Sequence, residues 1–297
     1  MPELPDVTVY VERLEALLVG RTLRGVRLKS PFLLRTVAPP LSAAVGREVT
    51  RVRRLGKRIV LDVGDVVLVL HLMIAGRLRW RPPGAAVTAR DALAAFDFDH
   101  GVVLFTEASP RKRASLHVIE PADLADFDRG GHAIDANDFE GFDAALRREN
   151  RTVKRALTDP RLFSGVGNAY SDEILFAARL SPARLTHALT ADEAQALHAA
   201  AVSILTTFTD RLRAEVGEGF PEKVTAFRPD MAVHGRYGEP CRACGQPVQR
   251  IRYADNETNY CARCQNADRL LADRGLSRLL KKDWPRTLEE LEALTRR

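Results

Sequence analysis

The sequence has few of the features that mark secreted, membrane-spanning or low-complexity proteins. It holds four cysteines, three methionines and two tryptophans among 297 residues, and we find no repeat or biased tract. The longest apolar run, VVLVLHLMIAG at residues 66–76, is too short to span a bilayer. The N-terminus lacks a basic region followed by a continuous apolar stretch. We therefore expect no membrane partner and a cytoplasmic protein of the bacterial cytosol or nucleoid.

The charge of the chain is unevenly distributed. The length of 297 residues suits two or three domains, and the content of 45% hydrophobic and 28% charged residues is ordinary for globular proteins. The net charge is +6, yet residues 21–82 alone hold 14 Arg or Lys against three acids. Such a stretch favours a polyanionic partner such as nucleic acid. The alternative is a solvated arginine-rich surface.

Hydrophobic periodicity divides the chain into different structural classes. Residues 5–18 have helical spacing and end at Gly20, and seven short runs rich in β-branched residues follow up to residue 106. Closely spaced strands of this kind favour an antiparallel sandwich or barrel over βαβ units. From about residue 131 the pattern is helical, and residues 190–216 predict the longest helix. The pair Gly130-Gly131 suits a hinge between domains.

All four cysteines lie in one short segment, CRACGQPVQRIRYADNETNYCARC. Cys241 and Cys244 form one C-x2-C pair, and Cys261 and Cys264 form a second pair sixteen residues later. This spacing is typical of a structural zinc site with four thiolate ligands, and the intervening residues predict a two-stranded hairpin. Disulfides are the alternative, which a cytosolic setting disfavours. We expect one structural Zn²⁺ that leaves no coordination position open for catalysis.

The segment LFSGVGNAYSDEILF, at residues 162–176, contains a glycine turn before a predicted helix. Glycines expose backbone N–H groups, and a helix N-terminus carries partial positive charge, so the turn suits a phosphate. The alternative is plain capping, with Asn168 as N-cap of the helix.

The opening residues MPELPDV also allow two interpretations. The two prolines and two acids can simply begin a helix. Alternatively, removal of Met1 would give Pro2 a secondary amine with Glu3 beside it.

Four motifs in register make the chain similar to one family. They are MPELPDV at the start, RRLGKRIVLDV at 53–63, GVGNAYSDEILFAARLSP at 165–182, and VHGRYGEPCRACG with NYCARCQ within 233–265. Together they resemble the formamidopyrimidine-DNA glycosylase/endonuclease VIII family of base-excision repair enzymes. The resemblance implies an α+β multidomain fold: an N-terminal helix and antiparallel β-sandwich, a helix–two-turns–helix domain and a zinc hairpin, with DNA bound in the cleft between. The implied domains are 1–130, 131–232 and 233–265, with a C-terminal extension of unknown role at 266–297.

The resemblance also implies roles for single residues. Pro2 matches the nucleophile of the family, Glu3 its general acid/base, and Lys57 a catalytic lysine that contacts phosphate. Asn168 matches a ligand of DNA phosphate, and Lys154 matches a lysine near the lesion pocket, so we expect both to contact DNA. The four cysteines match the zinc ligands. The implied partner is damaged double-stranded DNA, and the family suggests a monomer.

The implied chemistry explains the opening residues. An amine that attacks the sugar C1′ forms an iminium, which acidifies the neighbouring sugar proton and lets the 3′ phosphate leave by β-elimination. An α-amino group titrates at about 8, against about 10.4 for lysine, so a useful fraction is the free base near neutral pH. Glu3 is placed to move protons to and from the sugar.

The chain departs from the family at four places. Ile74, with Met73 beside it, stands where relatives carry a methionine that fills the gap of the flipped base. The loop 106–116 is longer and more basic than its counterpart, and Arg111, Lys112 or Arg113 could cover the orphaned partner base. Asn256 replaces the hairpin-tip arginine, which puts δ-elimination in doubt. The segment before the hairpin is short, so we expect abasic sites and ring-opened or oxidised pyrimidines to be preferred over 8-oxoguanine.

Three functions remain open on the sequence. The first is a bifunctional DNA glycosylase/AP lyase. The second is a non-catalytic binder of damaged DNA with the same fold, which retention of Pro2, Glu3 and Lys57 together disfavours. The third is a zinc-ribbon protein that binds RNA or protein, which explains nothing outside residues 233–265.

Overall fold

The fold was taken from a computed structural model, which describes residues 1–225, 227–253 and 256–295. The chain forms two compact units. Unit 1 comprises Met1–Gly130 and Thr206–Ala226, and unit 2 comprises Gly131–Leu205 and Phe227–Arg297. The antiparallel N-terminal region, the helical region and the hairpin predicted from the sequence are all confirmed.

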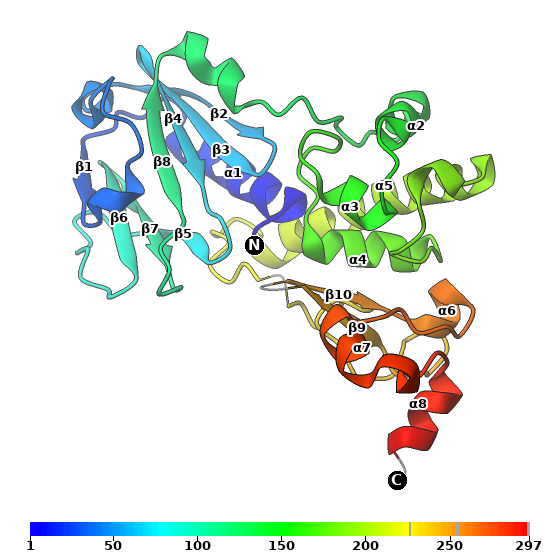
Figure 1. Cartoon of the computed structure of the whole chain (residues 1–297). Helices are drawn as coiled ribbons and strands as arrows, with labels where there is room; N and C mark the ends of the chain where they lie inside the picture. Colours follow the sequence, from blue (N-terminus) through cyan, green and yellow to red (C-terminus); the bar gives the residue numbers. More distant parts are fainter. Residues whose placement is uncertain (226, 254–255, 296–297) are drawn as a thin grey trace. The chain divides into compact units, whose positions relative to one another are not determined.

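Unit 1 consists of a helix and two antiparallel four-stranded sheets (Figure 1). One sheet has the strand order β1-β6-β7-β5 and the other has the order β2-β3-β4-β8. Helix α1 packs against β2 and β3. The bounds of these elements are α1 Leu4–Leu18, β1 Gly25–Leu28, β2 Val49–Leu55, β3 Arg58–Val63, β4 Val66–His71, β5 Gly76–Arg81, β6 Ala92–Phe98, β7 Gly101–Glu107 and β8 Ser115–Ile119.

The core of unit 1 is one apolar cluster shared by α1 and both sheets. Tyr10 and Leu14 of α1, Leu68 of β4, Phe96 of β6 and Phe105 of β7 all belong to it and are at most 4% exposed. Each such side chain stabilises the fold by about 1.5–3 kcal/mol relative to an exposed one. The helical period of α1 and the two-residue period of the strands therefore place their apolar faces on a common interior.

Strand β8 is the element of unit 1 that sequence periodicity missed. Its five residues follow a basic loop, and only Leu116 and Val118 show the alternation of a half-buried strand. It pairs with β4 through five register positions, from Val67 opposite Ile119 to His71 opposite Ser115. Tertiary pairing therefore makes a strand of a segment whose local pattern is too short to predict one.

Unit 2 is built from helices and a hairpin. The long helix α5 (Ala191–Val216) has 26 residues, and its last residues belong to unit 1. The shorter helices of the unit are α2 Phe139–Arg147, α3 Val153–Thr158 and α4 Asn168–Ala177. The sequence predicted a helical pattern from about residue 131, a helix after the glycine turn, which is α4, and the longest helix at 190–216, which is α5; the six residues of α3 are too few to be distinguished in that pattern.

The C-terminal part of unit 2 packs around the hairpin (Figure 1). Strands β9 (Gln249–Tyr253) and β10 (Asn256–Tyr260) pair antiparallel, and helix α6 (Ala262–Asn266) follows. Helices α7 (Arg274–Leu280) and α8 (Leu288–Thr295) form the C-terminal extension. Leu288 of α8 is buried with Ile251 and Tyr260 of the hairpin. The extension is therefore folded onto the hairpin. None of the helices in the described residues is long and apolar enough to cross a membrane.

Candidate functional site

The first turn of α1 fixes the conformation of the amino terminus. Glu3 is the N-cap residue in an extended conformation, and the Asp6 carboxylate accepts a hydrogen bond from the Glu3 backbone N–H at 2.8 Å. Pro5 lies in the first turn of the helix, where a backbone N–H would have no carbonyl partner within the helix, so the missing N–H of proline is tolerated. Pro2 and Glu3 are buried, Glu3 to 1% exposure. The residues that carry the sequence motif thus stand in a protein interior.

Charged groups surround the amino terminus. With Met1 in place the α-amine belongs to Met1, and the Pro2 nitrogen is an amide. Burial lowers the pKa of this amine, Arg77 and Lys57 lower it further, and Glu3 and Asp6 oppose them. Burial also lowers the pKa of Lys57, against the attraction of Glu3. The structure therefore brings Glu3, Lys57 and the terminus into one electrostatic group.

Asp6 also belongs to this group, although it was not among the site residues predicted from the sequence. Burial raises the pKa of Asp6 to about 7, with the negative charge of Glu3 adding to the effect. Its Oδ1 atom has no hydrogen-bond partner in the described chain, whereas Oδ2 accepts from Glu3. An acid three residues after an N-cap residue is a capping signal, which could have identified Asp6.

Ile74 lies at a tight turn between β4 and β5. The Gly76 N–H donates to the Leu72 carbonyl at 2.9 Å, and a Cβ on Gly76 would stand only 2.2 Å from that oxygen. Met73 takes a left-handed conformation with φ of 52°. The turn leaves the Ile74 side chain 48% exposed. Arg77 donates to the Ile74 carbonyl at 3.3 Å, which connects this turn with the group around the amino terminus.

The basic loop between β7 and β8 is fixed at its base by Glu107. This carboxylate is 1% exposed and accepts hydrogen bonds from the backbone N–H groups of Arg113 and Ala114 at 3.0 and 3.1 Å. The Lys112 ammonium donates to the Glu107 carbonyl. Arg111 and Arg113 are exposed. The loop therefore presents basic side chains from a base held by a buried acid.

Asn168 is the first residue of α4, and Gly167 takes the N-cap position. The capping interpretation of Asn168 is therefore wrong by one residue, because Asn168 is the first residue inside the helix and Gly167 is the N-cap. Its Nδ2 atom donates to the Glu257 carbonyl of β10 at 2.8 Å. Gly165 has a φ of 88°, a conformation that other residues rarely adopt. Asn168 thus connects the glycine turn to the hairpin.

Lys154 lies in the interior of unit 2. It is 8% exposed, and its ammonium donates to the Asn168 carbonyl at 3.0 Å, to Ser171 Oγ at 3.1 Å and to Asp172 Oδ1 at 2.5 Å. An ammonium has three hydrogens, and these three acceptors account for all of them. The expectation that Lys154 contacts DNA does not fit this placement.

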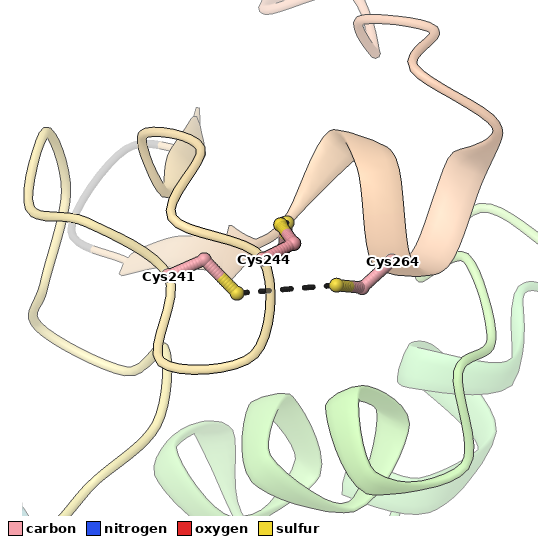
Figure 2. A group of neighbouring side chains, drawn as sticks. Cys241, Cys244 and Cys264 are labelled. Atoms are coloured by element: carbon pink, nitrogen blue, oxygen red, sulfur yellow. Dashed lines mark hydrogen bonds between the residues drawn. The ribbon is translucent and has the colours of Figure 1, made fainter.

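The four cysteines form one cluster at the base of the hairpin. Their sulfur atoms all lie within 4.8 Å of one another. The Cys241 and Cys264 sulfurs are 3.9 Å apart, and the Cys244 and Cys261 sulfurs are 3.4 Å apart. Figure 2 shows Cys241 and Cys264 pointing toward each other from the loop before β9 and from α6. Tetrahedral ligands about 2.3 Å from zinc would be spaced by about 3.8 Å. The donor set and its spacing fit one zinc ion.

Family models match most of the chain. Residues 1–116 match the formamidopyrimidine-DNA glycosylase N-terminal domain, and residues 132–211 match the H2TH domain of the same glycosylase. Residues 238–267 match a zinc finger found in FPG and IleRS. Residues 268–297 lie beyond the last of these matches.

Full-length relatives and solved structures agree with these models. Formamidopyrimidine-DNA glycosylases from Thermus thermophilus and Geobacter sulfurreducens are 35% and 30% identical, over 89% of this chain and 98% and 100% of their own. A structure of MutM with DNA containing carbocyclic 8-oxo-G has a TM-score of 0.79 at 25% identity, covering 89% of this chain and all of that one. A Lactococcus lactis Fpg bound to abasic-site DNA has a TM-score of 0.77 at 25% identity, covering 89% and 99%.

Proposed function

Since the chain belongs to the formamidopyrimidine-DNA glycosylase family, we propose that it excises damaged bases with the ring nitrogen of Pro2 as nucleophile. The enzyme is a bifunctional DNA glycosylase and AP lyase of the Fpg type. The buried position of Pro2 and Glu3 beside Lys57 is the observation that carries the proposal. It requires that Met1 is removed, because a peptide bond to methionine leaves Pro2 no electron pair to donate.

The reaction follows from the amine and the adjacent acid. The Pro2 nitrogen attacks C1′, the glycosidic bond breaks, and the base leaves with a proton. The nitrogen loses its proton and its electron pair then opens the sugar ring: the C1′–O4′ bond breaks, O4′ takes up a proton, and C1′ forms an iminium with the nitrogen. The iminium withdraws electrons from C2′, so loss of a C2′ proton breaks the C3′–O bond, expels the 3′ phosphate and cleaves the strand. Glu3 holds and moves the protons at the sugar, because its carboxyl follows the nucleophile directly in the chain. Asn256 stands where relatives carry the hairpin-tip arginine linked to δ-elimination, so we propose that the reaction ends after β-elimination.

The surroundings of the terminus favour the reactive form of the amine. Burial, with Arg77 and Lys57, lowers the pKa of the α-amine that stands there when Met1 is present. Pro2 is buried one residue further along, so the same cations act on its nitrogen after trimming. A lowered pKa increases the fraction of free base near neutral pH.

The remaining predicted residues bind DNA or support residues that do so. Lys57 holds a phosphate near the reacting sugar, and Asn168 holds another at the start of α4. Ile74, half exposed at its turn, fills the gap in the base stack, and Arg111 or Arg113 lies against the partner base. Lys154 instead positions α4 through Asp172.

Zinc has a structural role in this scheme. Cys241, Cys244, Cys261 and Cys264 hold the ion, which stabilises the hairpin and completes its four-coordinate site with thiolates alone. The four-part division at residues 130, 232 and 265 is proposed as the functional organisation of the chain.

Oxidised purines in duplex DNA are the proposed substrates. The relatives carry the formamidopyrimidine name, and one solved relative binds an 8-oxo-G analogue. These likenesses outweigh the preference for pyrimidines that the short segment before the hairpin suggested. We further propose that the enzyme acts as a monomer in the bacterial cytosol.

Borohydride trapping on abasic-site DNA tests the nucleophile. Reduction of the iminium should link wild-type protein covalently to DNA. A tag that leaves Pro2 acylated should abolish the cross-link, whereas the same tag at the C-terminus should not. Cross-linking that survives acylation of Pro2 would overturn the proposal.

A panel of duplexes tests the substrate class. Formamidopyrimidine and 8-oxoguanine should be excised faster than thymine glycol and dihydrouracil. Faster release of the two pyrimidines would restore the original expectation.

A further inference from the structure

Three basic side chains, Arg58, His71 and His117, stand together on the outer face of the β2-β3-β4-β8 sheet. Arg58 of β3 is directly opposite His71 of β4, and His71 is opposite Ser115 of β8. His117 lies two residues beyond Ser115, and therefore on the same face. Their strand neighbours Ile59, Leu70 and Leu116 point into the apolar core instead.

A short helical segment covers only part of this face. The 3-10 helix Pro121–Phe127 places Leu124 and Phe127 over the buried valines of β3 and β4. Phe127 marks the edge of the covered part. The guanidinium of Arg58 lies 5.8 Å from the centroid of its ring and donates to its carbonyl at 3.1 Å, and the His117 ring is 4.9 Å away. Beyond Phe127 the face is polar and half exposed.

The charge of Arg58 has no opposing acid there. Among the described residues, no carboxylate forms an ion pair with Arg58, His71 or His117. Burial lowers the pKa of His117, and the positive charges of Arg58 and Arg35 lower it further. Burial, followed by Arg58, Lys57 and His117, lowers the pKa of His71 to about 4. An anion from outside the chain would pair with Arg58 and accept hydrogen bonds from the neutral imidazoles.

We propose that Arg58 and His117, with Arg35 at the rim, bind a second backbone phosphate of the damaged DNA, adjacent to the phosphate assigned to Lys57. The proposal rests on the proposed function of the chain. On the strand register His71 of β4 stands between Arg58 of β3 and the β8 strand that carries His117, and Lys57 directly precedes Arg58, so these basic side chains form a continuous track that leads away from the amino terminus.

The chemistry of the pair suits a phosphodiester. A guanidinium offers a planar fork of donors to phosphate oxygens, and Phe127 holds that fork in place. The backbone of Arg35 is bound to β8, because its N–H donates to the Leu116 carbonyl at 2.9 Å. The exposed Arg35 side chain can therefore approach an anion above His117.

The salt dependence of binding to abasic-site DNA tests the proposal. Each phosphate contact contributes about 0.9 to the slope of log Kd against log salt concentration. We expect the slope to fall by about 1 in Arg58→Gln, with binding weakened about tenfold at low salt, whereas His117→Gln should weaken binding with little change in slope. Arg58→Lys should retain most of the slope. Arg47→Gln is the matched control, because Arg47 is 57% exposed and near Asp65. An Arg58→Gln slope equal to that of wild type would overturn the proposal.

Neutral methylphosphonate linkages identify the phosphate. At one position near the lesion, the methylphosphonate should weaken binding by wild type but not by Arg58→Gln. If the methylphosphonate weakens binding by wild type and by Arg58→Gln equally at every position, Arg58 contacts no phosphate. A second experiment adds inorganic phosphate in place of DNA and measures the melting temperature. If phosphate raises the melting temperature of wild type but not of Arg58→Gln, while both have the same salt slope of DNA binding, the site binds free phosphate and the proposal is overturned.

Borohydride trapping distinguishes failure of the second phosphate site from failure of the proposed function on which it rests. At saturating DNA, Arg58→Gln and His117→Gln should form the borohydride adduct as wild type does. If wild type forms no adduct, the Pro2 mechanism fails. If wild type forms it and Arg58→Gln keeps the full salt slope, only the second phosphate site fails.

Discussion

Leu68 and Phe105 of unit 1 lie in a large cluster of buried apolar side chains. Lys154, Asp172 and His234 of unit 2 are equally buried but charged or polar, and they bond to one another. The apolar clusters at the hairpin are small by comparison. Apolar burial is distributed over many contacts, whereas a buried ionic network depends on each partner. Loss of one partner in this network should therefore destabilise unit 2 more than loss of one apolar contact destabilises the large cluster of unit 1.

Removal of zinc should produce the largest effect. Structural zinc contributes about 10–16 kcal/mol in small zinc modules, and the hairpin has few other buried contacts. Chelation or Cys244→Ser should abolish specific DNA binding and expose the hairpin amides to hydrogen exchange. Amides of β4 and β7 should stay protected. Zinc should restore the chelated wild type but not the variant, and loss of protection in β4 would contradict the separation of the two units.

Asp172→Ala should destabilise unit 2 by about 3–5 kcal/mol, because it leaves the Lys154 ammonium buried without its counter-ion. Asp172 also accepts from His234 Nδ1 at 2.8 Å and from the Asn259 N–H at 3.2 Å. Lys154→Met should cost less, since Asp172 keeps those two donors. Urea unfolding followed by hydrogen exchange in α4 measures both. Equal costs, or a cost below about 1 kcal/mol for Asp172→Ala, would contradict the network.

Asp6 is the exception in unit 1, because it is a buried acid with an unpartnered oxygen. Its pKa rises from the ordinary 3.8 to about 7 through burial. The folded state then keeps a proton that the unfolded state has lost, so its free energy of unfolding falls as the pH rises from 4 to 7. Asp6→Asn should remove this dependence and stabilise the protein above pH 7, on the order of 2–4 kcal/mol.

Urea unfolding at pH 5 and pH 8 measures this dependence. Asp65→Asn is the matched control, since Asp65 is 91% exposed. A lower stability of Asp6→Asn than of wild type at pH 8 would show that the Asp6 charge is stabilising.

The C-terminal extension should give the smallest effect. Leu288 is 4% exposed, and the Leu271 N–H donates to the Tyr260 hydroxyl at 2.8 Å. Leu288→Ala should destabilise the hairpin by about 2–3 kcal/mol and speed hydrogen exchange in β10. Leu279→Ala is the control, because Leu279 is 76% exposed. Unchanged exchange in β10 would mean that the extension does not support the hairpin.

The sequence predicted what local pattern determines. Helical spacing gave residues 5–18, and the structure has α1 at Leu4–Leu18. The two cysteine pairs predicted a cluster of thiolates, and their sulfurs do lie together. Both features depend on residues close in sequence or on ligands of a known spacing.

Contacts between distant segments were not predictable in this way. From the sequence, Lys154 is a basic residue that could contact DNA. In the structure it is buried, and its ammonium donates to Asp172 of α4. The lowered pKa of His117 became visible only when β8 buried it beside Arg58. The pairing of strands and the burial of charges are set by the whole chain, so a single sequence window does not contain them.

Mass spectrometry of the borohydride-trapped protein is the most direct test of the account. The N-terminal peptide should begin at Pro2 and carry the reduced deoxyribose remnant on its ring nitrogen. Fully active enzyme that still carries Met1, or a remnant on a lysine such as Lys57, would contradict the central claim that Pro2 attacks the sugar.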